Sequence, residues 1–329
     1  MVVLVVKMVP LGSLRPAAAL LCPLLLQISV TAAALLPPSA NSDYTPGPRI
    51  VNGTEALQNK TMHQVSVRRR ETDWFFGAGH ICGGSLITPS VVLSAAHCYI
   101  DYESVDYRYR RADTFKVVLG SLNRYRKDNN TLVFDITHIV YPHDSFRDSF
   151  QDDIALLFLH DVVPENHPVV KPIRINRAPV AAGTMCQVTG WGEAEFEKQT
   201  SRQLMTVDVP IISTEVCQNE TDLKPGTIRT GMLCAGYMDG GRDACRGDSG
   251  GPLVCGDILV GIVSFGENCA QPRLPGVYTE VAYYAPWIEA HVKAAGGTLS
   301  GGANSAYRRG FALTIVTLLF TLFYFLQLN

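Results

Sequence analysis

The chain has 329 residues, a formal net charge of −2 and a hydrophobic fraction of 47%. This near-neutral balance lacks the excess of basic residues that nucleic-acid binding needs, so no nucleic-acid partner is predicted. When the two apolar ends are set aside, about 245 residues remain, the size of one large β-rich domain or of a double barrel.

The N-terminal segment has the features of a secretory signal. Lys7 and Arg15 precede an apolar run over residues 17–36, which contains three consecutive alanines suited to signal cleavage. We predict a signal peptide over residues 1–34 and a short, Pro-rich propeptide over residues 35–49. The run is long enough for an uncleaved signal anchor, but polar residues interrupt it, which favours cleavage.

The middle of the chain has a β pattern. Its apolar stretches are short and rich in Val and Ile, with Gly, Pro and Asn between them; examples are residues 91–93, 117–119 and 258–263. This pattern predicts antiparallel strands and no helical repeat. One helix is expected after the strands, over residues 283–291.

Three segments of this region carry residues suited to nucleophilic catalysis. His97 follows an apolar strand, Asp153 precedes the apolar sequence Ile-Ala-Leu, and Ser249 lies in Gly-Asp-Ser-Gly-Gly-Pro at residues 247–252. A serine hydroxyl attacks effectively only when a base takes its proton and N–H donors stabilise the resulting oxyanion. Asp152 is the alternative to Asp153; we favour Asp153 because it directly abuts the apolar strand.

The order His, Asp, Ser resembles that of the trypsin-like (chymotrypsin-type) serine proteases. Further hallmarks of that family are Cys-Gly-Gly-Ser-Leu at residues 82–86, Gly-Trp-Gly at residues 190–192 and Arg-Ile-Val-Asn-Gly at residues 49–53. The resemblance implies an all-β fold of two six-stranded antiparallel β-barrels with a short C-terminal helix. The protease domain is expected over residues 50–295.

The resemblance also implies a role for each candidate residue. Ser249 is the expected nucleophile, His97 the general base and acid, and Asp153 the carboxylate that orients His97. The N–H groups of Gly247 and Ser249 are expected to form the oxyanion hole.

A zymogen is expected on the same grounds. In the family, cleavage before the Ile-Val-Asn-Gly segment frees an α-ammonium that pairs with the acid preceding the serine. Here the cleaved bond would be Arg49–Ile50 and the acid Asp248. The uncleaved chain should be nearly inactive, because an unpaired buried charge costs about 3–5 kcal/mol.

Specificity for Arg or Lys is implied by Asp243, which corresponds to the floor of the family's specificity pocket. Ser264, Gly266 and Gly276 match other residues of that pocket, and the small glycines leave room for a long basic side chain. Ala244 beside the floor lacks a hydroxyl, which favours Arg over Lys because the guanidinium binds a carboxylate in a bidentate manner.

No metal or other cofactor is predicted. Ser121 occupies the position of the family's calcium-loop acid, and no His/Cys cluster has zinc-site spacing.

Eight of the nine cysteines fall within the predicted protease domain, and Cys22 falls within the predicted signal peptide. The resemblance implies four disulfides, which need an oxidising compartment: Cys82–Cys98, Cys186–Cys255, Cys217–Cys234 and Cys245–Cys269. Glycosylation is predicted at the sequons of Asn59, Asn129 and Asn219. The sequon of Asn52 is the weakest because activation would bury it.

The C-terminal end predicts membrane attachment. A Gly/Ser-rich linker over residues 296–310 leads to a hydrophobic tail over residues 311–329. The tail ends without a basic residue, and its only arginines precede it, against the positive-inside rule. Small residues, a polar spacer and a terminal apolar segment fit a GPI signal, which we favour over a retained transmembrane helix. The expected location is the secretory pathway and then the extracellular cell surface.

The sequence allows two interpretations of a basic loop. Arg108, Arg110 and Arg111 lie with two tyrosines in a long loop after His97. The loop either recruits an acidic partner or is a solvated segment prone to self-cleavage; we favour the second.

The predicted partners follow from the protease assignment. They are protein or peptide substrates with Arg or Lys at the cleavage site, an activating protease that can be the chain itself, protein protease inhibitors and the membrane. The rival hypothesis is a catalytically silent module that binds a partner, but all three catalytic residue types are present.

Overall fold

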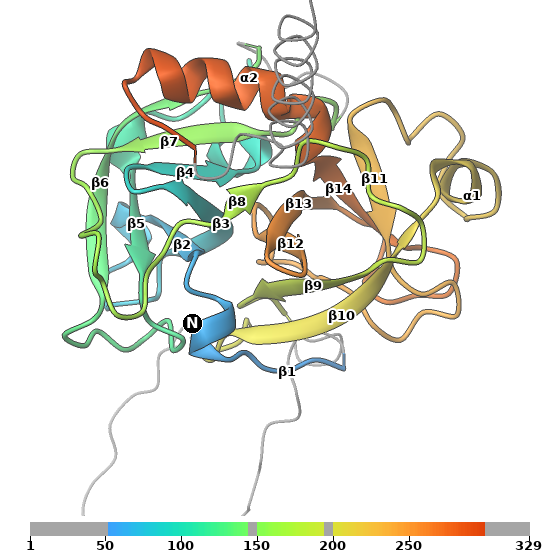
Figure 1. The fold of residues 1–329 in the computed structure, drawn as a ribbon, viewed down its shortest axis with the longest axis horizontal. Coiled ribbons are helices and arrows are strands. Elements are labelled where there is room, and N and C mark those ends of the chain that lie inside the picture. Colours follow the sequence, from blue (N-terminus) through green and yellow to red (C-terminus); the bar gives the residue numbers. More distant parts are fainter. Residues whose placement is uncertain (1–51, 144–149, 194–199, 300–329) are drawn as a thin grey trace, which may run out of the picture. The chain divides into compact units, whose positions relative to one another are not determined.

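The computed structural model describes residues 52–143, 150–193 and 200–299 (Figure 1). The predicted signal peptide and propeptide, the Arg49–Ile50 bond and the hydrophobic tail lie outside these residues. Within the described ranges, no helix is long and apolar enough to cross a membrane.

Six antiparallel strands close the first barrel in the order β2-β3-β4-β7-β6-β5. They are β2 (Gln64–Arg69), β3 (His80–Thr88), β4 (Val91–Ser94), β5 (Phe115–Leu119), β6 (Leu132–Val140) and β7 (Ala155–Leu159). Side chains alternate along β6, where Phe134 and Ile136 are buried while Val133 and Asp135 are exposed. The buried set forms the core inside the barrel.

The second barrel is also closed, in the order β9-β10-β11-β14-β13-β12, because β12 pairs with β9. Its strands are β9 (Met185–Gly190), β10 (Met205–Ile212), β11 (Met232–Ala235), β12 (Pro252–Cys255), β13 (Ile258–Phe265) and β14 (Gly276–Glu280). Two short strands join its edges: β1 (Thr54–Glu55) pairs with β10, and β8 (Arg174–Ile175) runs parallel to β13. The predicted all-β fold of two six-stranded barrels is confirmed.

Helix α2 (Val281–Ala294) packs on both barrels (Figure 1). It buries one stripe at helical spacing: Val281, Tyr284, Ala285, Ile288 and Val292. This stripe shares one core with Leu93 and Leu156 of the first barrel and with Leu259 and Ile262 of the second. All of β7 is buried for this reason, since the barrel core covers one face and this shared core the other. The helix predicted over residues 283–291 is thus confirmed.

The remaining helices are short. Helix α1 (Thr214–Asn219), which the sequence pattern did not reveal, starts after Ser213, whose hydroxyl accepts a hydrogen bond from the Val216 N–H. Single 3-10 turns are η1 (Gln58–Lys60), η2 (Arg70–Thr72), η3 (Ala96–Tyr99) and η4 (Ala112–Thr114).

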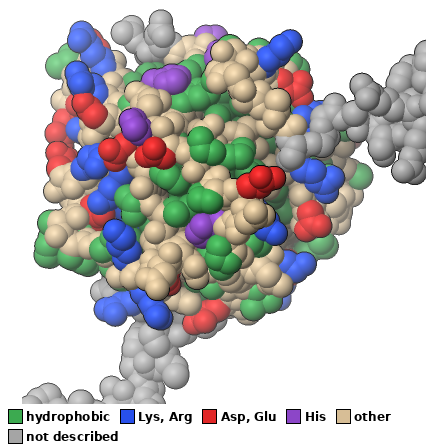
Figure 2. Space-filling view, turned by 60° about the vertical axis from the view of Figure 1, so that its left-hand side comes forward, with side chains coloured by type: hydrophobic (Ala, Val, Ile, Leu, Met, Phe, Trp, Pro, Cys, Tyr) green, Lys and Arg blue, Asp and Glu red, His purple; other side chains and the backbone are tan. Residues whose placement is uncertain are grey.

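The structure contains the four disulfides that the resemblance implied, with the same pairing. Three of them lie in the second half of the domain, and Cys82–Cys98 ties β3 to η3 in the first. On the face shown in Figure 2, acidic and basic side chains are interspersed, and neither sign dominates.

Candidate active site

A cavity of about 650 Å³ brings together residues from distant parts of the chain. His97 of the first barrel lines it together with Ser249 and Asp243, which belong to loops of the second barrel. The expected base, the expected nucleophile and the expected specificity acid therefore face one shared space. Arg246, Phe150 and Phe265 also line it.

Asp153 fixes the orientation of His97. The Asp153 Oδ2 atom lies 2.8 Å from His97 Nδ1, and Oδ1 accepts a 2.9 Å hydrogen bond from the His97 backbone N–H. The Ser264 hydroxyl donates a third bond to this fully buried carboxylate, at 2.5 Å. An ionised carboxylate only accepts hydrogen bonds, so His97 Nδ1 carries a proton and Nε2 is the basic nitrogen.

The neighbouring Asp152 does not contact His97 in this arrangement. Its backbone has a φ of 58°, and its carboxylate accepts a 2.6 Å hydrogen bond from the Tyr284 hydroxyl and lies 3.0 Å from His143 Nε2. The geometry thus favours Asp153 over Asp152 as the orienting acid.

The loop around Ser249 makes a tight turn that requires glycine at position 250. Gly250 has a φ of 76°, and a Cβ atom there would lie 2.4 Å from Ser94 Oγ and 2.6 Å from the Gly83 carbonyl oxygen. The Ser249 carbonyl accepts a 2.7 Å bond from the Gly83 N–H, which ties the turn to β3. Among the described residues, the N–H groups of Gly247 and Ser249 have no acceptor, so both are free to bind an oxyanion.

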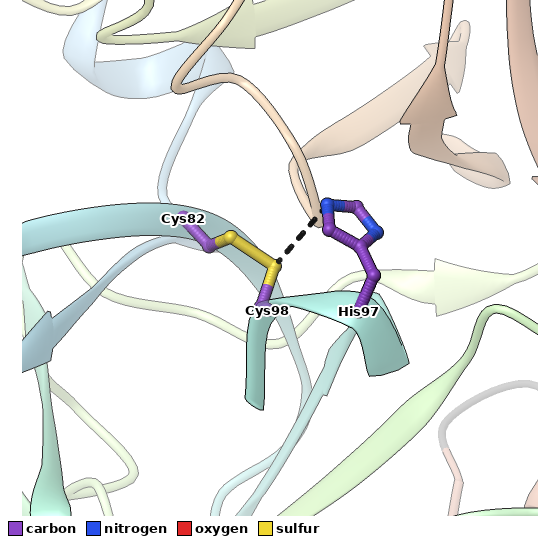
Figure 3. Close-up of side chains that lie close together, drawn as sticks. All are labelled: Cys82, His97 and Cys98. Atoms are coloured by element: carbon purple, nitrogen blue, oxygen red, sulfur yellow. Dashed lines mark hydrogen bonds between the residues drawn. A yellow bond between two sulfur atoms is a disulfide. The ribbon is translucent and has the colours of Figure 1, made fainter. Parts of the chain in front are cut away.

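No hydrogen bond links Ser249 Oγ to His97 Nε2 within the described ranges. Such catalytic bonds are commonly long in free enzymes and shorten when substrate binds. The Nε2 atom instead lies 3.9 Å from the sulfur of Cys98 (Figure 3). His97, Cys98 and Cys82 are clustered like metal ligands, but the disulfide removes the thiolates that a metal would need.

Asp243 lies almost completely buried at the base of the cavity, with 3% of its surface exposed. Its Oδ2 accepts a 3.1 Å bond from the Ala270 N–H, while Oδ1 has no hydrogen-bond partner among the described residues. Burial raises the pKa of this carboxyl to about 7. A Cβ atom on Gly276 would lie 2.8 Å from Oδ1, so glycine keeps the approach to the carboxylate open.

Asp248 is fully buried beneath the Ser249 turn. Its two oxygens accept hydrogen bonds from the N–H groups of Gly192, at 2.7 Å, and Cys245, at 2.9 Å. Burial raises the pKa of Asp248 to about 6 despite these donors. Ile50, whose freed α-ammonium is the predicted partner of Asp248, and Arg49, which precedes the predicted cleavage, lie outside the described residues.

Comparison with known proteins identifies the family of this domain. The trypsin family model matches residues 50–288. The chain belongs to the trypsin family of serine proteases. It is 38% identical to trypsin eta of Drosophila melanogaster over 252 residues, which cover 76% of this chain and 89% of that protein. It is 34% identical to trypsin-1 of Salmo salar over 240 residues, which cover 73% of this chain and 89% of that protein.

Two site residues of this trypsin-family domain were not found from the sequence. The Phe150 ring lies 5.8 Å from the His97 ring and 4.7 Å from that of Phe265, so an aromatic wall borders the cavity beside the base. His80 Nε2 lies 3.2 Å from the Gly247 carbonyl oxygen, and its Nδ1 lies 2.8 Å from Ser66 Oγ. Burial lowers the pKa of His80 to about 3, so it is neutral and donates to Gly247 through Nε2. Neither Phe150 nor His80 lies in a sequence motif that marks it as a site residue.

Proposed function

We propose that this trypsin-family protein is a zymogen-derived serine endopeptidase that hydrolyses peptide bonds after Arg or Lys through an acyl-enzyme. The observation that carries the proposal is the buried Asp243 carboxylate in the same cavity as Ser249 and His97. Its Oδ1 has no hydrogen-bond partner in the part of the chain that the structure describes. A buried carboxylate needs a cation, and the side chain of the substrate supplies one.

The chemistry follows from the positions of the donors and acceptors. His97 Nε2 takes the proton of Ser249 Oγ as that oxygen bonds to the substrate carbonyl carbon, whose oxygen becomes negative. The N–H groups of Gly247 and Ser249 bind this oxyanion. His97 then gives its proton to the leaving amine as the C–N bond breaks and the acyl-enzyme forms.

The second half of the reaction uses the same groups. Water attacks the acyl carbon and gives a proton to His97 Nε2, and the tetrahedral species collapses with return of that proton to Ser249 Oγ. Throughout, Asp153 stabilises the imidazolium without itself becoming protonated. Its burial and its three donors keep the carboxylate in place for both steps.

Activation by cleavage at Arg49–Ile50 is supported by the environment of Asp248. The carboxylate is fully buried and, within the described residues, has N–H donors but no cationic partner. A new α-ammonium from Ile50 would neutralise it beneath the Ser249 turn. Because the bond follows Arg49, the enzyme's own specificity permits activation of one molecule by another.

A secretory and cell-surface location is also proposed. The disulfides are typical of an oxidising compartment. The sequon residues Asn59, Asn129 and Asn219 are exposed, as glycosylation requires. We infer that the tail over residues 311–329 is a GPI signal or a membrane helix and that protein protease inhibitors bind at the cavity.

The test is the hydrolysis of small amide substrates by the purified chain without the tail over residues 311–329, after verified cleavage at Arg49. Matched Arg, Lys and Phe amides are compared, with Ser249→Ala as the control. Turnover of the Arg or Lys amides that is lost in the variant supports the proposal. Absence of turnover would favour the silent binding module.

A further inference from the structure

An asparagine at the start of the described chain is bonded to the loop that carries the specificity acid. Asn52 is exposed, and its side-chain Nδ2 donates a 2.7 Å hydrogen bond to the carbonyl oxygen of Gly241. The two residues are 189 positions apart in the sequence. Because Gly241 closely precedes Asp243, this one amide joins the segment that follows the predicted cleavage to the base of the cavity.

Hydrogen bonds continue from Gly241 to the Asp243 carboxylate. The Gly241 N–H donates to the Ala270 carbonyl oxygen at 2.7 Å, and the Ala270 N–H donates to Asp243 Oδ2 at 3.1 Å. Ala270 and Asp243 are both buried. Consecutive hydrogen bonds therefore connect Asn52 with the carboxylate that the proposed function assigns to the substrate cation.

The backbone of Ala270 makes this connection sensitive to the loss of one bond. Its φ is 57°, in the left-handed region that a residue with a Cβ atom rarely adopts. Such a conformation persists only where the surrounding contacts hold it. The hydrogen bonds to Gly241 and Asp243 are two of these contacts. If the Gly241 loop loses its attachment to Asn52, Ala270 can relax and withdraw its N–H from Asp243.

The residue after Asn52 favours a reaction that removes the same amide. Gly53 follows it, and this is the only Asn-Gly pair in the sequence. Asparagine is a labile residue, and glycine has no side chain to hinder attack of its nitrogen on the asparagine amide. The Gly53 N–H has no hydrogen-bond acceptor among the described residues, and Asn52 lies in a turn with a φ of 53°. The nitrogen that would react is thus not held in a hydrogen bond.

The reaction, deamidation, needs no reactant other than water. The Gly53 nitrogen bonds to Cγ of Asn52 and loses its proton, while the Cγ–Nδ2 bond breaks and ammonia leaves with that proton. Water then opens the cyclic imide at one of its two carbonyl carbons, which gives an aspartate or an isoaspartate at position 52. The N–H donor is replaced by a carboxylate, which only accepts hydrogen bonds and would face another acceptor, the Gly241 carbonyl.

We propose that Asn52 is a deamidation site and that this reaction is a timer, which weakens the binding of substrate cations at Asp243 as the enzyme ages. The inference rests on the proposed protease function and adds a limit on the active lifetime of the enzyme. Asn52 is a positioning residue in this role, because it acts on the substrate through Gly241 and Ala270. The limit is set by the chain itself and requires neither an inhibitor nor a second protease.

The test follows binding in the pocket while the protein ages. The full chain carrying Ser249→Ala is cleaved at Arg49 by an added protease and kept at mildly alkaline pH; without Ser249 it cannot digest itself. Anion exchange separates deamidated molecules, and mass spectrometry of peptides locates the change. The Kd of p-aminobenzamidine, a fluorescent amidine with the charge of an arginine side chain, is then measured. We expect deamidation at Asn52 and a Kd about tenfold higher in the deamidated fraction, the effect of one lost hydrogen bond.

Variants separate loss of the amide from the added charge. Asn52→Asp should bind p-aminobenzamidine as weakly as the deamidated fraction does. Asn59→Asp adds the same charge at another exposed asparagine of this segment and should leave the Kd unchanged. In chains that retain Ser249, Asn52→Asp should lower kcat/KM about tenfold for Arg amides and less for Phe amides, which general damage to the fold would not do. The aged protein folds before it deamidates, so its Kd decides the matter even if Asn52→Asp fails to fold.

The outcomes distinguish the timer from the protease function. The timer alone is overturned if Asn52 keeps its amide throughout the incubation, or if the deamidated fraction binds p-aminobenzamidine as tightly as the fresh protein. Equal weakening by Asn59→Asp would assign the effect to charge and would also overturn it. If the fresh protein binds no better than Asp243→Asn, the assignment of the pocket is wrong and the timer falls with it.

Discussion

Replacement of Asp243 by Asn removes the charge at the base of the cavity and preserves the shape of the side chain. In the free enzyme, burial raises the pKa of this carboxyl from 3.8 to about 7. That change means that ionisation is roughly 4 kcal/mol less favourable than in water. The guanidinium of a bound substrate must offset this cost, and the free Oδ1 gives it a direct partner.

The size of the effect follows from the loss of one partner of a buried charge pair. Such a truncation typically costs about 2–5 kcal/mol. At about 1.4 kcal/mol for each factor of ten, Asp243→Asn should lower kcat/KM for Arg amides by roughly 30-fold to several thousand-fold. The loss should be smaller for a Phe amide, which brings no charge to the pocket.

The assay compares kcat/KM for matched Arg and Phe amides in the wild-type and Asp243→Asn enzymes after cleavage at Arg49. The ratio of kcat/KM for the Arg amide to kcat/KM for the Phe amide separates an effect on the pocket from general damage to the Ser249 turn. An equal loss for both substrates would mean that Asp243 supports the fold rather than specificity. An unchanged Arg rate would refute the charge argument altogether.

Three further predictions concern pH, activation and a disulfide. Protonation of Asp243 below its pKa of about 7 removes the negative charge. The KM for Arg amides should therefore rise as the pH falls through 7, while the KM for Phe amides should change less. Parallel profiles of KM against pH for the two amides would contradict this prediction. An Arg49→Ala precursor should be nearly inactive, and Ile50→Gly should lower the activity of the cleaved enzyme; a fully active precursor in the amide assay would refute activation through Asp248. Replacing both Cys82 and Cys98 by Ala should cost about 3 kcal/mol, given their separation of 16 residues, and should lower Tm in a thermal melt. An unchanged Tm would show that the bridge contributes little to stability.

Much of the fold could be predicted because its signals are local. The apolar residues 117–119 belong to β5, and residues 258–263 belong to β13, since alternation and β-branched side chains mark such strands directly. His97, Asp153 and Ser249 could be proposed as site residues because each has a distinctive sequence around it. The inference that these residues lie close together came from the family resemblance and not from their spacing in the sequence alone.

The parts that could not be predicted depend on tertiary contacts. From the sequence, the loop after His97 had three basic residues without evident partners. In the structure each of them pairs with an acid of the same loop at 2.6–2.8 Å: Arg108 with Asp106, Arg110 with Asp101 and Arg111 with Asp113. The loop is therefore largely neutralised from within, which agrees with the solvated interpretation and not with recruitment of an acidic partner. Phe150 was missed for a similar reason, because its ring contacts arise only in the folded chain.

The anchoring of Asp153 by the second barrel bears on the timing of biosynthesis. Strands β2 to β7 leave the ribosome first, but the Ser264 hydroxyl and the Thr279 hydroxyl, which bond to Asp153, belong to β13 and β14. Helix α2, which packs on both barrels, follows later still. The growing polypeptide thus has no complete catalytic centre until almost the whole domain has been translated. The order of synthesis therefore delays the full set of hydrogen bonds to Asp153 until the second barrel is present.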